Sequence, residues 1–207
     1  MDGIKELDEL KAMIHTKTFE EDPTLTSITV DDVPDWWDTI VRKDAEGGFA
    51  VETGTEQEWV DGLALVLAVG EWHDPDEDGL DAAETYCDCV GDPSDFDEMC
   101  NLLIMADRGE LGYIPYGYNV GSPRENFGLH MAQVNDLAGS LAKVEDGEKL
   151  AGCIDYEKYG HDYAYDMGLG ERGYIDMSGN YPMLDKYSHD EILSEAGIYD
   201  IDEQEIG

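Results

Sequence analysis

The chain has 207 residues, 42% of them hydrophobic, which is enough apolar material for one large domain or two to three small ones and argues against a disordered chain. Fifty acidic residues stand against twelve Lys and Arg, and this net charge of −38 excludes a basic surface for direct nucleic-acid binding. The sequence has no apolar run long enough to cross a membrane, and it begins with a polar, amphipathic segment instead of a signal peptide. We therefore expect a cytoplasmic protein without membrane contact.

Residues 1–54 predict an N-terminal region with both helix and strand. Apolar side chains recur at helical spacing over residues 3–15, and "TSITV", which ends at Val30, favours a strand. A short helix is expected in "VPDWWDTIVRK" and a further strand in "GGFAVETG". We expect Trp36 and Trp37 to belong to the core.

Residues 55–108 predict an acidic helical region. Thr55 and Glu58 form a capping box ahead of a long apolar helix. The segment "SDFDEMCNLLIMA" predicts another helix, capped by Ser94 with Asp97. Between these two helices, residues 80–89 predict a helix that carries three acids on one face: Asp81, Glu84 and Asp88.

Residues 109–127 are rich in Gly, Pro and Tyr and predict a loop or linker. Residues 128–207 then predict two helical stretches, a strand, a capping box that begins at Ser188, and a frayed tail. "GLGERG" at 168–173 matches G-x-G-x-x-G but follows a helix and precedes a strand, so it predicts a flexible loop. The expected fold class is α+β: elongated, with two to three small domains, helix-rich with short strands and small sheets.

The stretch from Asp74 to Glu84 begins like a calcium-binding EF-hand loop, with acids at alternate positions followed by Gly79. Its twelfth position is Thr85 instead of Glu, so the pattern lacks the bidentate carboxylate ligand that completes the coordination of calcium. A calcium-binding module remains an alternative. A zinc site could be formed by the Cys-x-Cys pair at Cys87 and Cys89 together with Cys100 and His73, but no second C-x-x-C motif supports it. The sequence also contains no catalytic motif. We therefore expect no metal, no cofactor and no enzymatic activity.

The acidic residues are concentrated along the chain. Nineteen of them lie between Asp44 and Asp107 without one Lys or Arg, and eight lie between Asp185 and Gly207 beside a single Lys186. The repulsion among these like charges would be offset in any of three ways. The protein could live in high salt, it could bind many cations, or it could bind a partner with a strongly basic site. Since duplex DNA carries one charge per roughly 1.7 Å, 38 net charges correspond to about 65 Å of duplex. The charge thus favours a protein that imitates DNA.

The segment from Ile154 to Met167, "IDYEKYGHDYAYDM", predicts a helix with Asp155, Asp162 and Asp166 on one face and tyrosines beside them. Together with the preceding helix and spacer from Met131 and the following "GYI", it resembles the C-terminal signature of ArdA-type antirestriction proteins over residues 131–175. The shared positions are Ile154, Asp155, Tyr156, Glu157, Tyr159, Gly160, Asp162, Gly173, Tyr174 and Ile175. His161 stands where that family has Arg.

The resemblance implies an elongated, multi-domain α+β protein that can form a homodimer, imitates bent B-DNA and occupies the DNA groove of a type I restriction-modification enzyme. The leading hypothesis is therefore a non-enzymatic DNA mimic, encoded by a phage or mobile element, that blocks a host defence protein. A related alternative is an anti-CRISPR protein that covers the DNA channel of an effector complex. The carboxylates expected to replace phosphates are Asp74, Asp76, Asp78, Asp81, Glu84, Asp88, Asp92, Asp95, Asp97, Glu98, Asp155, Glu157, Asp162 and Asp166.

Overall fold

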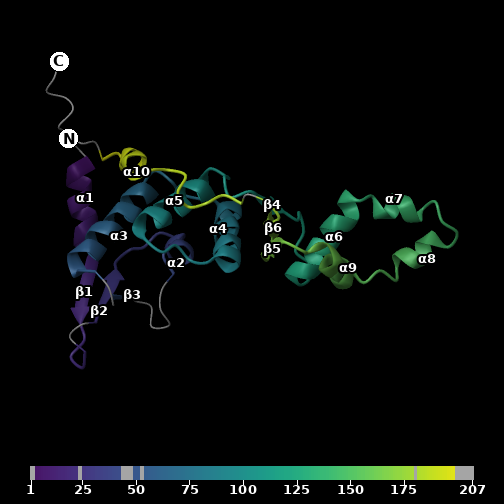
Figure 1. Ribbon diagram of the computed structural model, residues 1–207, viewed down its shortest axis with the longest axis horizontal. Coiled ribbons are helices and arrows are strands. Elements are labelled where there is room, and N and C mark those ends of the chain that lie inside the picture. Colours follow the sequence, from purple (N-terminus) through teal and green to yellow (C-terminus); the bar gives the residue numbers. More distant parts are fainter. Residues whose placement is uncertain (1–2, 23–24, 43–48, 52–53, 180, 199–207) are drawn as a thin grey trace, which may run out of the picture. The chain divides into compact units, whose positions relative to one another are not determined.

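The computed structural model describes residues 3–22, 25–42, 49–51, 54–179 and 181–198, and within them the chain is α+β, with ten helices and two three-stranded antiparallel sheets (Figure 1). This confirms the expected α+β class with many helices and small sheets. The chain divides into two compact units, each built from separate segments. Unit 1 comprises Met1–Asp76, Asp92–Arg108 and Met183–Gly207, and unit 2 comprises Glu77–Gly91 and Gly109–Pro182. This division differs from the four consecutive regions expected from the sequence, because contacts between distant segments define each unit.

The N-terminal part of unit 1 is a helix followed by a small sheet. Helix α1 (Gly3–Ala12) ends earlier than predicted, since Ile14 already begins strand β1 (Ile14–Thr18). This strand pairs antiparallel with β2 (Thr26–Val30), which in turn pairs with β3 (Phe49–Val51). Ile14 and Ile28 are buried, so one side of the sheet faces the core.

The core of unit 1 is built around α3 (Glu56–Gly70), in which every residue from Leu63 to Val69 is buried. The predicted capping box is confirmed, because Glu58 donates its backbone N–H to Thr55 Oγ1 at 3.2 Å and accepts that of Thr55 at 2.8 Å. Helices α1, α5 (Phe96–Asp107) and α10 (His189–Glu195) pack against α3 (Figure 1). Trp36 and Trp37, at the start of α2 (Trp37–Ile40), are each 1% exposed and complete the core as expected.

In unit 2, helix α4 (Glu77–Val90) packs against strands β5 (Met167–Leu169) and β6 (Gly173–Asp176). Strand β4 (Tyr113–Pro115) forms the other edge of this sheet, whose order is β4-β6-β5. Leu111 and Tyr116 are buried, so residues 109–127 are part of the fold and not the predicted linker. The "GLGERG" segment is likewise not a flexible loop, because it forms the hairpin between β5 and β6.

The rest of unit 2 is helical: α6 (Pro123–Val134), α7 (Leu137–Leu141), α8 (Gly147–Ala151) and α9 (Tyr156–Tyr163). Helices α6 and α9 lie side by side and touch through two glycines (Figure 1). A Cβ atom on Gly128 would collide with the carbonyl oxygen of Tyr156, and one on Gly160 with that of Arg124. Gly160 of the ArdA-like segment is therefore required by close helix packing.

Candidate partner-binding surface

Helix α4 carries five acidic residues, and several of them lie on its exposed face. Its inner face buries Ala82, Ala83 and Tyr86, and the Tyr86 hydroxyl donates to the carbonyl oxygen of Pro182 at 2.8 Å. This anchoring leaves Asp78, Glu84 and Asp88 exposed on the outer face. Glu84 and Asp88 are one turn apart, which separates their Cβ atoms by about 5–6 Å. The helix thus holds a row of negative charges toward solvent.

Arg172, in the turn between β5 and β6, neutralises the N-terminal end of this row. Its guanidinium pairs with Glu77 and Asp81, and its Nη2 lies 3.6 Å from Asp78. Asp81 also accepts a hydrogen bond from the Tyr113 hydroxyl at 3.4 Å, and its side chain is only 20% exposed. Burial together with this carboxylate raises the pKa of Tyr113 above its ordinary value. The expectation that Asp81 is a free surface charge is wrong, because Asp81 binds Arg172 inside unit 2.

Three of the predicted carboxylates in unit 1 stabilise helix ends. Asp95 is the N-cap of α5 and accepts the backbone N–H of Glu98 at 2.8 Å. Glu98 accepts hydrogen bonds from the backbone N–H and the hydroxyl of Ser94 at 2.6 and 2.8 Å. Asp97 lies 2.9 Å from Nδ1 of His189, the first residue of α10. Ser94 is therefore not the N-cap that the sequence predicted, since Asp95 occupies that position.

The remaining acids of this stretch are exposed. Asp74 and Asp76 follow the buried His73, and Asp92 makes an ion pair with Arg42 Nε at 3.3 Å. Asp74, Asp76, Asp92, Asp95, Asp97 and Glu98 belong to unit 1, whereas Asp78, Asp81, Glu84 and Asp88 belong to unit 2. The acidic stretch that is continuous in sequence is thus distributed over both units.

Helix α9 is shorter than the sequence predicted, and this changes the roles of its acids. Asp155 is the N-cap and accepts the backbone N–H of Lys158 at 3.0 Å. Asp166 lies beyond the C-terminal end of the helix and has a left-handed backbone with φ of 58°. The predicted single helical face with Asp155, Asp162 and Asp166 therefore does not form. Asp162 and Glu157 are within the helix, and all four carboxylates are exposed.

The calcium-binding loop that was kept as an alternative does not form. An EF-hand loop makes a sharp turn at its sixth residue, but α4 begins at Glu77, so Gly79 and most of the ligand positions from Asp74 onward lie on a helix. Within the described parts of the chain, no three or more His, Cys, Asp or Glu side chains are grouped so that they could hold a metal ion.

Of the fourteen carboxylates that were predicted to contact a partner, eleven are exposed to solvent. The three half-buried exceptions are Asp81, Asp97 and Glu98.

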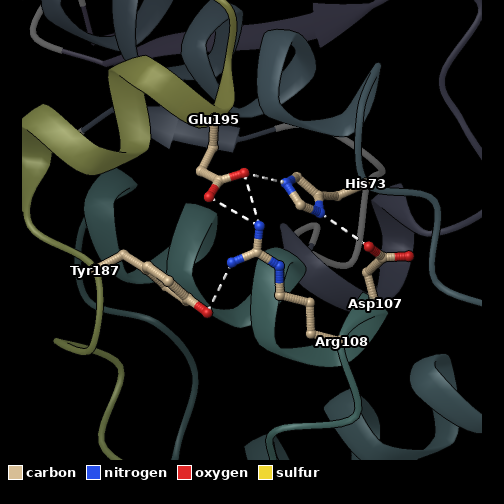
Figure 2. A network of polar contacts seen from close by, with 5 residues as sticks. All are labelled: His73, Asp107, Arg108, Tyr187 and Glu195. Atoms are coloured by element: carbon tan, nitrogen blue, oxygen red, sulfur yellow. Dashed lines mark hydrogen bonds and ion pairs between the residues drawn. The ribbon is translucent and has the colours of Figure 1, made fainter.

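Unit 1 also contains a polar network that no sequence pattern predicted. His73 is 5% exposed, and its Nδ1 lies 2.9 Å from Asp107 Oδ2 while its Nε2 lies 3.1 Å from Glu195 Oε2 (Figure 2). Arg108 Nη2 donates to both carboxylate oxygens of Glu195 at 2.8 Å, and Nη1 donates to the Tyr187 hydroxyl at 2.9 Å. The network binds the C-terminal segment to the ends of α3 and α5.

Glu195 is the centre of this network. Partial burial alone would raise its pKa, but the hydrogen bonds and charges of Arg108 and His73 outweigh burial and lower the pKa below its ordinary value. The buried Asn101 adds a second link to the same segment. Its side chain donates to the carbonyl oxygen of Tyr187 at 3.0 Å and accepts the backbone N–H of Tyr187 at 2.8 Å. These contacts span 79 or more sequence positions to the C-terminal segment, so local sequence carries no signal of them.

No described helix is both long and apolar enough to cross a membrane. No family model, curated protein or solved structure matches the chain.

Proposed function

We propose that the chain is a non-enzymatic inhibitor that imitates DNA and occupies the DNA-binding groove of a host type I restriction-modification enzyme in the bacterial cytoplasm. One observation carries this proposal: eleven of the fourteen predicted carboxylates are exposed to solvent, in a chain with a net charge of −38. Exposed carboxylates held by folded helices can replace phosphates as ligands of the Lys and Arg side chains in such a groove.

The position of the carboxylates on packed helices supports this function. Glu84 and Asp88 extend from a helix whose other face is buried, and Asp155 is fixed as a helix cap. Charges that are ordered before binding lose less conformational entropy on association than charges on a disordered tail. The resemblance of residues 131–175 to ArdA-type proteins points to the same class of target.

The test is competition between the protein and duplex DNA for a purified type I methyltransferase, followed by fluorescence anisotropy of the DNA. We expect the protein to displace DNA with an affinity that falls steeply between about 50 and 200 mM salt, as DNA affinity does. Neutralising one exposed carboxylate should weaken inhibition slightly. Inhibition should be abolished when six are changed together to Asn or Gln: Asp74, Glu84, Asp88, Glu157, Asp162 and Asp166.

The proposal is contradicted if one of these single substitutions eliminates inhibition, because the summed charge would then not be the cause. The same assay with a CRISPR effector complex in place of the methyltransferase tests the anti-CRISPR alternative.

Circular dichroism at low ionic strength serves as the control for folding of each variant. A protein that needs high salt for its acidic surface would lose its cooperative unfolding transition there.

A further inference from the structure

The "GLGERG" hairpin, to which the proposed function gives no role, packs directly against α4. A Cβ atom on Gly168 would collide with the sulfur of Cys89, and one on Gly170 would collide with the side chain of Thr85. Thr85 precedes Cys89 by about one turn of α4, so the hairpin follows the helix toward its N-terminal end. Arg172, farther along the hairpin, contacts the turn before Thr85. Close packing through glycines thus brings one arginine to the acidic face of the helix.

The Arg172 guanidinium meets three carboxylates at the N-terminal end of α4. Its Nε donates to Asp81, its Nη1 pairs with Glu77, and its Nη2 lies 3.6 Å from Asp78. The hydrogen bond to Asp81 and the charges of all three acids outweigh burial and raise the pKa of the guanidinium. One cation of the chain therefore occupies the position from which a Lys or Arg of a partner would contact these acids.

Glu84 lies on the same face of α4 as Glu77. Residues seven apart on a helix share a face, and the two glutamates are about 10 Å apart along the axis. Glu84 is exposed, and among the residues that the structure describes no Lys, Arg or His forms an ion pair with it. A cation of a partner can therefore reach Glu84 without displacing Arg172, whereas at Glu77 it cannot.

We propose that Arg172 is an internal counterion that competes with the Lys and Arg residues of the partner for the N-terminal end of α4, so that the partner contacts this helix at Glu84. This inference rests on the proposed function and adds where on α4 the contact falls. A second cation beside Asp81 meets repulsion from the guanidinium at close range. The charge-assisted hydrogen bond from Arg172 must also break before Asp81 accepts another donor. Arg172 thus limits the affinity of the helix for a basic groove.

The first experiment compares two substitutions that remove the same charge from the same helix face. Glu84→Gln and Glu77→Gln both change an exposed side chain, and that of Glu77 is 83% exposed despite its ion pair. Dissociation constants against the type I methyltransferase are measured at about 150 mM salt, where a charge acts over about 8 Å and the net charge of the chain counts little. Thermal unfolding verifies that both variants fold.

We expect Glu84→Gln to bind about threefold more weakly and Glu77→Gln to bind within about 1.5-fold of the unmodified protein. Equal losses, or a larger loss for Glu77→Gln, would overturn the internal counterion and leave the DNA mimic intact.

Removing the counterion tests the competition directly. Arg172→Gln should bind the methyltransferase about threefold more tightly at about 50 mM salt, and this gain should shrink as salt rises. Arg172→Lys keeps the charge and should bind as the unmodified protein does. Weaker binding of Arg172→Gln, with its fold verified by circular dichroism, would overturn the inference. If Arg172→Gln does not fold, the comparison of Glu84→Gln with Glu77→Gln decides.

A measurement without the enzyme separates this inference from the proposed function. A tetra-arginine peptide is titrated into isotopically labelled protein, and the amide chemical shifts of α4 are followed by NMR. We expect larger shift changes at Glu84 than at Glu77, because Arg172 repels the peptide from the N-terminal end. Equal changes would overturn the internal counterion. If the unmodified protein does not bind the methyltransferase although the peptide prefers Glu84, the proposed function is wrong and the internal counterion is supported.

Discussion

The C-terminal segment is held to unit 1 by Glu195, so removing its charge should loosen this segment. Glu195→Gln keeps the size of the side chain but leaves one acceptor oxygen, so one of the two charge-assisted hydrogen bonds from Arg108, each 2.8 Å long, is lost and the other becomes weaker. It also leaves His73, 5% exposed, with only one carboxylate partner. Hydrogen bonds to charged groups contribute about 1.5–3 kcal/mol each, and water competes at a side chain that is 28% exposed. We expect the free energy of unfolding to fall by about 2 kcal/mol at pH 7.

The same substitution should change the pH dependence of stability. Because the pKa of Glu195 is lowered in the folded protein, the unfolded chain takes up the proton first as the pH falls. The stabilisation is therefore complete above the ordinary carboxyl pKa and is lost as the pH falls through the lower value of the folded state. Glu195→Gln lacks this contribution, so the difference in stability between the two proteins should be full at neutral pH and should shrink as the pH falls below the ordinary carboxyl pKa.

Urea unfolding followed by tryptophan fluorescence measures this effect selectively, since all four tryptophans, at positions 36, 37, 59 and 72, lie in unit 1. Asp185→Asn is the matched control, because it removes one charge from an exposed side chain of the same segment and should change stability by less than about 0.5 kcal/mol. The reasoning is refuted if Glu195→Gln and the unmodified protein differ as much at pH 3 as at pH 7. It is also refuted if Asp185→Asn costs as much as Glu195→Gln.

Two further predictions concern unit 2. Arg172→Met should destabilise unit 2 by about 1–2 kcal/mol by leaving Asp81 without its cation, and hydrogen exchange should show faster exchange of the α4 amides. Lys149→Met, which breaks an exposed pair with Asp146, should have little effect, and equal exchange rates in both variants would contradict the assignment. Gly160→Ala should cost about 1–3 kcal/mol by forcing α9 away from α6, although alanine favours a helix, and thermal unfolding followed by circular dichroism measures it. The control Gly152→Ala meets only the Lys149 carbonyl oxygen at 3.6 Å, and a stabilising effect of Gly160→Ala would show that the close approach is not required.

The sequence by itself determined the features that depend on neighbouring residues. The capping boxes at Thr55–Glu58 and Ser188–Glu191 were predictable because the interacting groups are three positions apart. The apolar run of α3 likewise predicted a buried helix, and the mixture of helical and strand patterns along the chain predicted the α+β class. Such features need no knowledge of which distant segments meet.

Only the tertiary structure decided which carboxylates are available to a partner. Asp81 and Glu84 are three residues apart in one helix, yet Asp81 pairs with Arg172, 91 positions away, whereas Glu84 is exposed. The network of His73 with Glu195 joins residues 122 positions apart, and the sequence around either residue gives no hint of the other. The physical reason is that a charge is neutralised by whichever group packing brings within a few ångströms, and packing is a property of the whole fold.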